Sequence, residues 1–273
     1  MKPAGSPVFS AAAIEKDLGV RRVGTTCIVY PSVSSTNDVL RSVQSDRRYD
    51  GLAVFANQQT QGRGRAGRSW LAAPNSSVLC SVLLIFDGQV GRYAGPVNLA
   101  AALAAALAVR RTFAIDAVLR WPNDVYVAGK KLGGILIEGS QIDPSASAFV
   151  IGIGLNVTQR TDEFPAEIAE RACSAAIVLD RKLDDSDRLR LARNLLIEFD
   201  KMVARVAADD LDSLRSDWLA LTPGRNGPVT VEHENRRLDA RIIDLDPREH
   251  SLLVQDHDGL IWHLRPGASR LVT

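Results

Sequence analysis

The pattern of hydrophobic and polar positions divides the chain into three parts. In the first part, short apolar runs alternate with amphipathic segments, which is typical of a sheet covered by helices. The segments 35–44 and 99–109 have the spacing of helices, and 124–139 is predicted to be a hairpin that turns near Ala128–Gly129. The remaining predicted strands of this part are 27–33, 52–58, 76–86, 117–121 and 148–157.

The second part has a longer helical period. Residues 161–185 show no clear period and are predicted to be a loop or an irregular helix. Apolar residues then recur every three or four positions over 185–206, which predicts an amphipathic helix with a cap at Ser186/Asp187. A second helix is expected over 211–221.

The third part begins where TPGRNGP, residues 222–228, interrupts the helical period. Short strands separated by polar turns follow, and five of them in succession predict a small barrel. They cover residues 228–233, 238–246, 251–256, 260–266 and 269–273. We therefore predict an α/β (α+β) fold with a mixed sheet, divided into an N-terminal extension (1–24), a main domain (25–222) and a small β-barrel (223–273).

Composition and charge narrow the class of protein. Of the 273 residues, 46% are hydrophobic, which supplies a large core and excludes global disorder. The formal net charge is only +1, whereas a protein that lives on DNA usually carries a basic excess. The three cysteines are far apart and fit core positions in a reducing compartment. The chain starts with no apolar signal segment, and its longest apolar run, 99–109, is too short to span a membrane. We expect a cytoplasmic protein.

One segment cannot bury itself. Residues 59–70 read QTQGRGRAGRSW, with three glycines alternating with three arginines. Such a run can be a solvated loop, a nucleic-acid contact, or a cradle in which backbone N–H groups and guanidiniums bind an anion. Taken alone, the run favours the first two interpretations.

The order of the neighbouring motifs changes this balance. Ser35-Thr36-Asn37 comes first, followed by GRGRAGR at 62–68, WPND at 121–124, KLGGILIE from Lys131 and IGIGLN from Ile151. Over residues 25–273 this series resembles the biotin–protein ligases, also called biotin–[acetyl-CoA-carboxylase] ligases. The resemblance implies a catalytic domain similar to that of class II aminoacyl-tRNA synthetases, followed by an SH3-like barrel. It also implies a short form without an N-terminal DNA-binding domain, because about two dozen residues precede the core.

The activity that the resemblance implies uses ATP and biotin as substrates, with Mg²⁺ accompanying ATP. Biotin's carboxylate is joined to the α-phosphate, pyrophosphate leaves, and biotinyl-5′-AMP is then attacked by a lysine of a biotin carboxyl carrier protein. Neither DNA nor a membrane is expected as a partner, and no protein ligands for a metal are predicted. The sequence does not specify the oligomeric state.

The same resemblance assigns site residues. The expected biotin-binding set is Ser35, Thr36, Asn37, Gln59, Gly62, Arg63, Gly64, Arg65, Arg120, Gly133, Gly152 and Gly154. The expected ATP-binding set is Arg63, Arg65, Trp70, Asn123, Lys131 and Asn156. Arg120, Arg65 and Lys131 are the expected catalytic residues. The residue types suit this chemistry, because a ureido group needs neutral donors and acceptors while two anions need fixed cations.

Arg120 departs from the family pattern, in which the residue before WPND is usually lysine. Arginine keeps the charge but not the compact ammonium. If point-like geometry is required, the protein is slow or only holds biotin; a lipoate- or octanoate-transferring relative is a second alternative. A purely structural role is also open, in which Arg120 pairs with Asp116 or Asp124.

Overall fold

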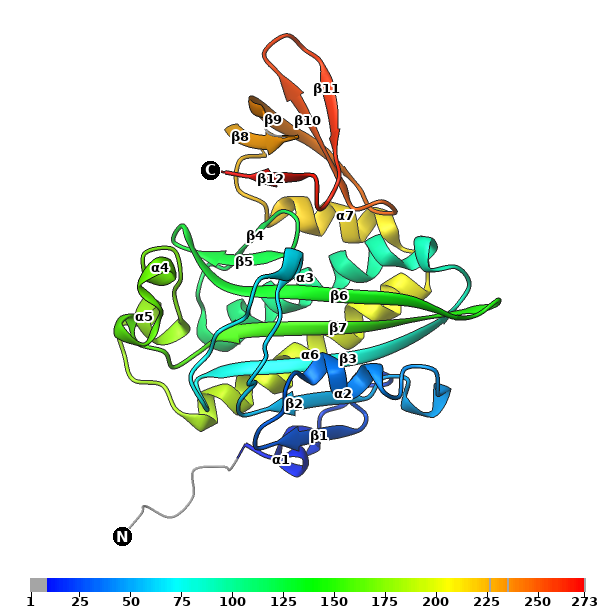
Figure 1. Cartoon of the computed structure of the whole chain (residues 1–273), viewed down its shortest axis with the longest axis vertical. Coiled ribbons are helices and arrows are strands. Elements are labelled where there is room, and N and C mark those ends of the chain that lie inside the picture. Colours follow the sequence, from blue (N-terminus) through cyan, green and yellow to red (C-terminus); the bar gives the residue numbers. More distant parts are fainter. Residues whose placement is uncertain (1–8, 226, 235, 273) are drawn as a thin grey trace.

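A computed structural model of the chain describes residues 9–225, 227–234 and 236–272, so residues 1–8 of the predicted extension lie outside the described part. The described residues form a large mixed sheet covered by helices and a smaller antiparallel sheet attached to one end (Figure 1). This arrangement confirms the predicted fold class.

The large sheet has seven strands in the order β1-β2-β3-β7-β6-β5-β4. Its strands are β1 (Cys27–Tyr30), β2 (Ala53–Ala56), β3 (Ser77–Asp87), β4 (Val118–Arg120), β5 (Asp124–Val127), β6 (Lys130–Asp143) and β7 (Ala146–Asn156). Only the pair β1–β2 is parallel within this sheet. Ten consecutive residues of β3 are buried, because both faces of the sheet are covered, and this explains its continuous apolar sequence.

The predicted hairpin forms between β5 and β6. Ala128 and Gly129 both have positive φ values, 47° and 76°, which a two-residue type I′ turn requires. Val127 pairs with Lys130 directly across the turn.

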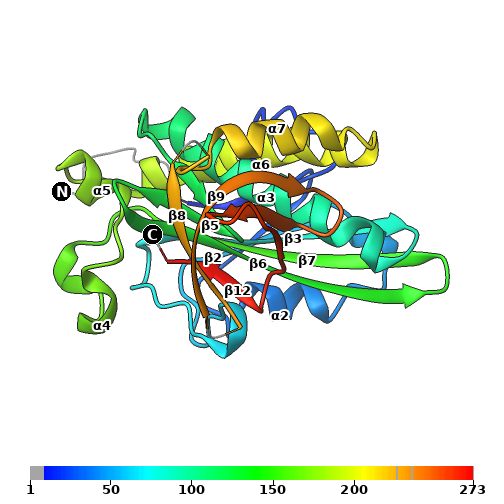
Figure 2. The ribbon, with the colours of Figure 1, turned by 90° about the horizontal axis from the view of Figure 1, so that it is seen from above.

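Helices cover the two faces unequally. The long helices α3 and α6 pack on one face, and the short α2 lies on the other (Figure 2). The helices are α1 (Ala11–Glu15), α2 (Thr36–Arg41), α3 (Val90–Phe113), α4 (Ala166–Ala169), α5 (Ala175–Leu179), α6 (Asp185–Ala207) and α7 (Leu211–Ala220), with 3₁₀ turns η1 (Arg47–Tyr49), η2 (Arg65–Gly67) and η3 (Thr161–Glu163). The short pieces η3, α4 and α5 occupy the stretch that was expected to be irregular.

Two helix starts differ from the prediction for reasons that the structure shows. Helix α3 begins at Val90 rather than at residue 99, because Gly95 and Pro96, which look like helix breakers, are accommodated inside it. A Cβ at Gly95 would overlap the carbonyl of Arg248, so the backbone of the second sheet can approach α3 this closely only because residue 95 is glycine. The predicted cap of α6 at Ser186/Asp187 is wrong: Asp184 is the cap, and its carboxylate accepts from the Ser186 N–H.

Helix α3 is long and apolar enough to cross a membrane by length and composition alone. In the structure, 72% of its most apolar window is buried inside the protein, where it packs on α6, β6 and β7. It is therefore the buried core helix that the alanine- and leucine-rich run predicted.

The second sheet has the order β11-β10-β9-β8-β12. Its strands are β8 (Pro228–His233), β9 (Arg236–Asp246), β10 (Ser251–Asp256), β11 (Ile261–Leu264) and β12 (Ser269–Leu271). The sheet is joined to the larger part by an ion pair between Arg215 and Asp244, and by the Trp121 indole, which donates to the His250 carbonyl at 3.0 Å.

Candidate active site

Strand register places several predicted residues on one face of the large sheet. Arg120 pairs with Asp124, Asp124 with Gly134, and Gly134 with Gly154. Directly paired residues project to the same face, so this row crosses four strands on a single side. One step along β7 lies Gly152, which is two residues from Gly154 and therefore faces the same way. This is the face that carries α2.

Glycines form the floor of this face. A Cβ at Gly152 would overlap the amide of Asn37, and one at Gly154 would come within 2.6 Å of the Trp70 ring. The Asn37 and Trp70 side chains therefore lie directly on the backbone of β7. No larger residue leaves room for them, which explains the glycines in IGIGLN.

Gly133 does not belong to this floor. A Cβ there would overlap the Leu155 side chain, on the opposite face of the sheet. Its neighbour Gly134 faces the site instead, where a Cβ would lie 3.2 Å from the Asp124 carboxylate. The sequence analysis omitted Gly134. The register of β6 with β7, which no local pattern reveals, decides which of the two faces the site.

One end of the face is neutral and closely hydrogen-bonded. Ser35, Thr36 and Asn37 are each only 3% exposed. Gln59 Oε1 accepts from the Thr36 N–H at 2.8 Å and lies 3.0 Å from the Thr36 hydroxyl. The Thr36 hydroxyl is also 2.6 Å from Ser81 Oγ, which donates to Asn37 Oδ1 at 2.6 Å. Ser35 is the N-cap residue of α2, but its side chain makes no capping hydrogen bond, so side-chain capping does not explain this motif.

Two carboxylates that the sequence analysis missed border the neutral end. Glu138 accepts from Asn37 Nδ2 at 2.7 Å and from Arg63 Nη2 at 3.2 Å. Asp38 accepts from Arg63 Nη1 at 2.6 Å. The last residue of KLGGILIE therefore faces the site, and its even spacing from Gly134 along β6 was the signal that could have found it.

The Gly/Arg loop, residues 59–70, folds back on itself above this face. The Trp70 N–H donates to the Gly62 carbonyl at 2.9 Å, and the Gly64 N–H donates to the Arg68 carbonyl at 2.7 Å. A Cβ at Gly62 would overlap the Trp70 carbonyl, so the close return of the chain requires glycine there. Arg65 then reaches across to Asn123, whose Oδ1 accepts from Nη1 at 3.2 Å.

The other end of the face is cationic. Lys131 Nζ donates to Asp124 Oδ1 at 2.6 Å. Burial lowers the pKa of the Arg65 guanidinium, an effect that the nearby Asp124 carboxylate opposes. Arg120 donates to the Leu271 carbonyl at 3.2 Å, and its guanidinium lies 4.9 Å from the centre of the Tyr126 ring. This end of the face therefore carries three cations, of which Lys131 is paired with Asp124.

The carboxylates considered as structural partners of Arg120 are engaged elsewhere. Asp116 pairs with Arg110, and Asp124 pairs with Lys131. Arg120 is held instead by a backbone carbonyl of the second sheet and by an aromatic ring. Its charge is therefore not neutralised by an ion pair within the described residues.

The two predicted asparagines differ. Asn123 lies beside Arg65, at the cationic end. Asn156 is 5% exposed, donates to the Cys173 carbonyl at 3.0 Å and accepts from Gln159 and Ser77. Its amide is thus used in joining the end of β7 to the segment before α5.

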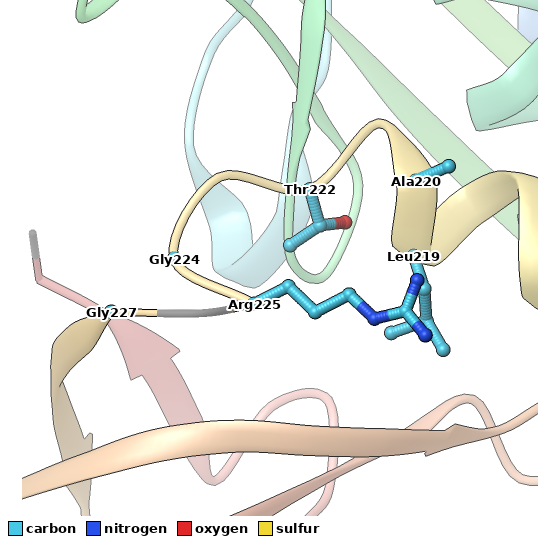
Figure 3. Close-up of a pocket in the computed structure, with 6 residues that line it drawn as sticks. All are labelled: Leu219, Ala220, Thr222, Gly224, Arg225 and Gly227. Carbon is cyan, nitrogen blue, oxygen red and sulfur yellow. The ribbon is translucent and has the colours of Figure 1, made fainter.

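Two hollows lie outside this face. One, of about 280 Å³, adjoins the cationic end and is lined in part by Arg65, Asn98, Asn123 and His250. Burial, with a smaller contribution from Arg65, lowers the pKa of His250 to about 3. The other, of about 410 Å³, lies in the connection between α7 and β8 (Figure 3). Among the described residues that line it there is no Asp, Glu, His, Lys or Cys, and the Thr222 hydroxyl is engaged with the Trp218 carbonyl.

The described residues contain no group of three or more His, Cys, Asp or Glu side chains placed to hold a metal ion. The three cysteines are buried and free. Burial raises the pKa of Cys27 to about 12 and that of Cys173 to about 11, so neither is a thiolate nucleophile near neutral pH.

Comparison with known proteins gives concordant matches. A sequence model of the biotin/lipoate A/B protein ligase family matches residues 29–156. The chain is 36% identical over 179 residues to the biotin–[acetyl-CoA-carboxylase] ligase of Paracoccus denitrificans, which covers 64% of this chain and 72% of that protein. It is 26% identical over 252 residues to the bifunctional ligase/repressor BirA of Bacillus spizizenii, covering 92% and 76%. The biotin protein ligase from Aquifex aeolicus, solved in complex with biotin and ATP, matches with a TM-score of 0.70 and 25% identity over 90% of this chain and 97% of that one.

Proposed function

The chain belongs to the biotin/lipoate A/B protein ligase family, and on that premise we propose that it is a biotin–[acetyl-CoA-carboxylase] ligase. It activates biotin with ATP as biotinyl-5′-AMP and transfers the biotinyl group to a lysine of a biotin carboxyl carrier protein. The likeness to a ligase structure that contains biotin and ATP supports both substrates.

The observation that carries this proposal is the polarity of the site face. A partly buried neutral network at Thr36 and Gln59 lies at one end, and Arg65, Arg120 and Lys131 lie at the other, where Lys131 pairs with Asp124. Biotin has the same polarity, with a neutral ureido ring at one end and a carboxylate at the other. ATP brings further negative charge only to the cationic end.

In the first step, a carboxylate oxygen of biotin attacks the α-phosphorus, and the bond from that phosphorus to the bridging oxygen breaks, releasing pyrophosphate. Both reactants are anions, so the residues must offset their repulsion and hold them in line. We assign this role to Arg120 and Arg65, with Lys131 as the supporting cation. Arg65 is half enclosed between the loop and Asn123, where a charge acts more strongly than in water.

In the second step, the neutral amine of the carrier lysine attacks the acyl carbon of biotinyl-5′-AMP, the bond from that carbon to the phosphate oxygen breaks, AMP leaves, and the nitrogen of the new amide releases one proton to water. The Gly/Arg loop lies over the face and can shield the mixed anhydride from water. Gly62 and Gly64 supply the tight return that brings backbone N–H groups and arginines to one place.

Three further features belong to the same proposal. Mg²⁺ enters with the ATP phosphates, which is the usual way that this ion is bound in nucleotide sites. Residues 25–222 form the catalytic domain and 223–273 the C-terminal barrel, whose Leu271 carbonyl holds Arg120. The compartment is the cytoplasm, in keeping with three free buried cysteines.

The test is incubation of the purified chain with ATP, Mg²⁺, biotin and an apo carrier domain. Release of pyrophosphate and a mass increase of one biotinyl group on one carrier lysine are expected. Modification by lipoate or octanoate but not by biotin would favour the transferase alternative. Tight biotin binding without pyrophosphate release would show a binding homologue instead.

A further inference from the structure

Glu138 connects three elements at the neutral end of the site. It belongs to β6, it accepts from Asn37 of α2 at 2.7 Å, and it accepts from Arg63 of the Gly/Arg loop at 3.2 Å. Arg41 of α2 lies 3.5 Å from its other oxygen. No single secondary-structure element explains these contacts, since their partners are far apart in the sequence.

The carboxylate fixes the orientation of the Asn37 amide. An ionised carboxylate can only accept hydrogen bonds, so the Asn37 NH₂ group must face Glu138. Asn37 Oδ1 then faces Ser81, which must donate to it at 2.6 Å. A hydroxyl has one proton, so Ser81 accepts from the Thr36 hydroxyl across their 2.6 Å contact.

A backbone donor sets the orientation of the Gln59 amide. Its Oε1 accepts from the Thr36 N–H at 2.8 Å, which turns the Gln59 NH₂ group away from Thr36. Within the described residues that NH₂ group makes no hydrogen bond, so it remains a donor for a ligand. A ureido oxygen is a matching acceptor. Glu138 thus directs the Thr36 hydroxyl proton to Ser81 rather than to Gln59, whose Oε1 accepts from the Thr36 N–H.

Glu138 also restrains the loop. The Arg63 guanidinium is divided between Asp38 and Glu138, which come from α2 and β6. Arg63 therefore ties the Gly/Arg loop to both walls of the neutral end. This use of Arg63 differs from that of Arg65, which faces Asn123 at the cationic end.

Resting on the proposed function, we propose that Glu138 is a positioning residue for biotin. It sets the direction of the hydrogen bonds from Asn37 through Ser81 to the Thr36 hydroxyl, and through Arg63 it holds the Gly/Arg loop over the neutral end. It touches neither the reacting carboxylate nor the phosphate.

The decisive experiment exchanges the charged and neutral partners. Glu138→Gln removes the enforced direction, and Asn37→Asp alone places two carboxylates in contact. The double variant restores one acceptor and one donor with reversed identity, and the carboxylate introduced at position 37 can still accept from Ser81. We expect each single variant to raise the KM for biotin roughly tenfold with kcat changed less than about threefold. The double variant should recover most of that loss.

A second measurement reports on the loop. Trypsin can cleave after the arginines of the Gly/Arg loop, and Glu138→Gln should increase the cleavage rate there severalfold without biotin, because Arg63 loses one of its two carboxylates. The control is Asp143→Asn at the far end of β6, where the carboxylate contacts Ser145. It should change neither biotin KM nor cleavage.

The outcomes separate the two proposals. If the wild-type chain forms no biotinyl-5′-AMP, the proposed function fails, and the cleavage rates still test the restraint of the loop. If the wild-type chain is active and Glu138→Gln has unchanged biotin KM and cleavage, the positioning role of Glu138 is refuted. Additive losses in the double variant would likewise refute the directional role.

Discussion

The two ends of the site face differ in how their polar groups are satisfied. At the neutral end, hydrogen bonds run from Gln59 through Thr36 and Ser81 to Asn37, and Asn37 donates to Glu138. At the cationic end, Arg120 is held by only a carbonyl and a ring, and Arg65 by an amide. The neutral end is joined within itself and leaves the Gln59 NH₂ group as a donor, whereas the cationic end holds Arg120 without an ion pair among the described residues.

This difference indicates how each end recognises its ligand. A chain of hydrogen bonds fixes the direction in which each donor and acceptor points. It discriminates between neutral ligands because a ligand with the wrong pattern leaves polar groups unpaired. Guanidiniums without carboxylate partners can turn toward an anion as it arrives. Loss of a group at the neutral end should therefore weaken ligand binding, and loss of a cation should slow the reaction.

The strongest test of the comparison is Arg120→Ala. If Arg120 lies between biotin's carboxylate and the α-phosphate, its removal should lower the rate of biotinyl-5′-AMP formation by roughly a hundredfold or more, as loss of one charge-stabilising donor typically does. Single-turnover formation of the adenylate measures this rate. Biotin affinity without ATP should change far less.

Two further variants accompany this test. Arg120→Lys should preserve or raise the rate, because the charge is kept. Arg110→Ala removes an arginine that pairs with Asp116 beside the same strand and should leave the rate unchanged. An unaltered rate in Arg120→Ala would remove the residue from the mechanism and leave it as a link to the second sheet.

The next largest effect is expected from Arg65→Ala. Its partner is the phosphate, which biotin lacks, so retention of biotinyl-5′-AMP should fall by roughly ten- to thirtyfold while biotin binding is nearly kept. Dissociation rates of the two ligands provide the comparison. Arg48→Ala, at an exposed arginine paired with Asp46, is the control. Equal losses for both ligands would contradict the division between the two ends.

The fold was largely predictable because the signals of its elements are local. The hairpin between β5 and β6 follows from Ala128–Gly129, and the buried strand β3 from its apolar run. The start of α3 was not predictable, because Gly95 is required there by the close approach of the Arg248 carbonyl, which is distant in the sequence. Local propensity contains no information about that contact.

The site was predictable where a motif names the residue and not where register decides. Thr36, Gln59 and Arg65 stand in recognisable motifs, whereas the choice of Gly134 over Gly133 depends on the pairing of β6 with β7. Glu138 was missed for a similar reason: its role depends on partners from α2 and the Gly/Arg loop.

At the neutral end, Thr36→Val tests the chain of hydrogen bonds, and its expected effect is smaller than that of either arginine variant. Valine keeps the shape but removes the hydroxyl between Gln59 and Ser81, so the Kd for biotin should rise by roughly five- to tenfold. The Kd for ATP should stay unchanged. Thr230→Val, at a half-buried position of β8 where the hydroxyl donates to Asp239, is the control for the same substitution. A slower adenylation rate with unchanged biotin affinity would reverse the roles of the two ends.

The smallest expected effect is a loss of stability at low pH, and it comes from His250 beside the cationic end. His250 is 2% exposed beside the hollow at Arg65, and its pKa is lowered to about 3, so it is neutral in the folded protein. Its ordinary pKa is 6.5. The unfolded chain therefore binds one more proton between these values, and the stability of the folded protein is lost as pH falls through that window. At pH 6 this amounts to about 0.8 kcal/mol of the free energy of unfolding, and above pH 7.5 to almost nothing.

Urea unfolding of His250→Phe should show a shallower loss between pH 7.5 and pH 5 than the wild type, whereas His257→Phe, at an exposed ring, serves as the control for removal of a histidine. Equal slopes in wild type and His250→Phe would mean that the His250 ring binds protons equally in the folded and unfolded protein, so that the cationic end gains a charge in acid that we do not assign to it.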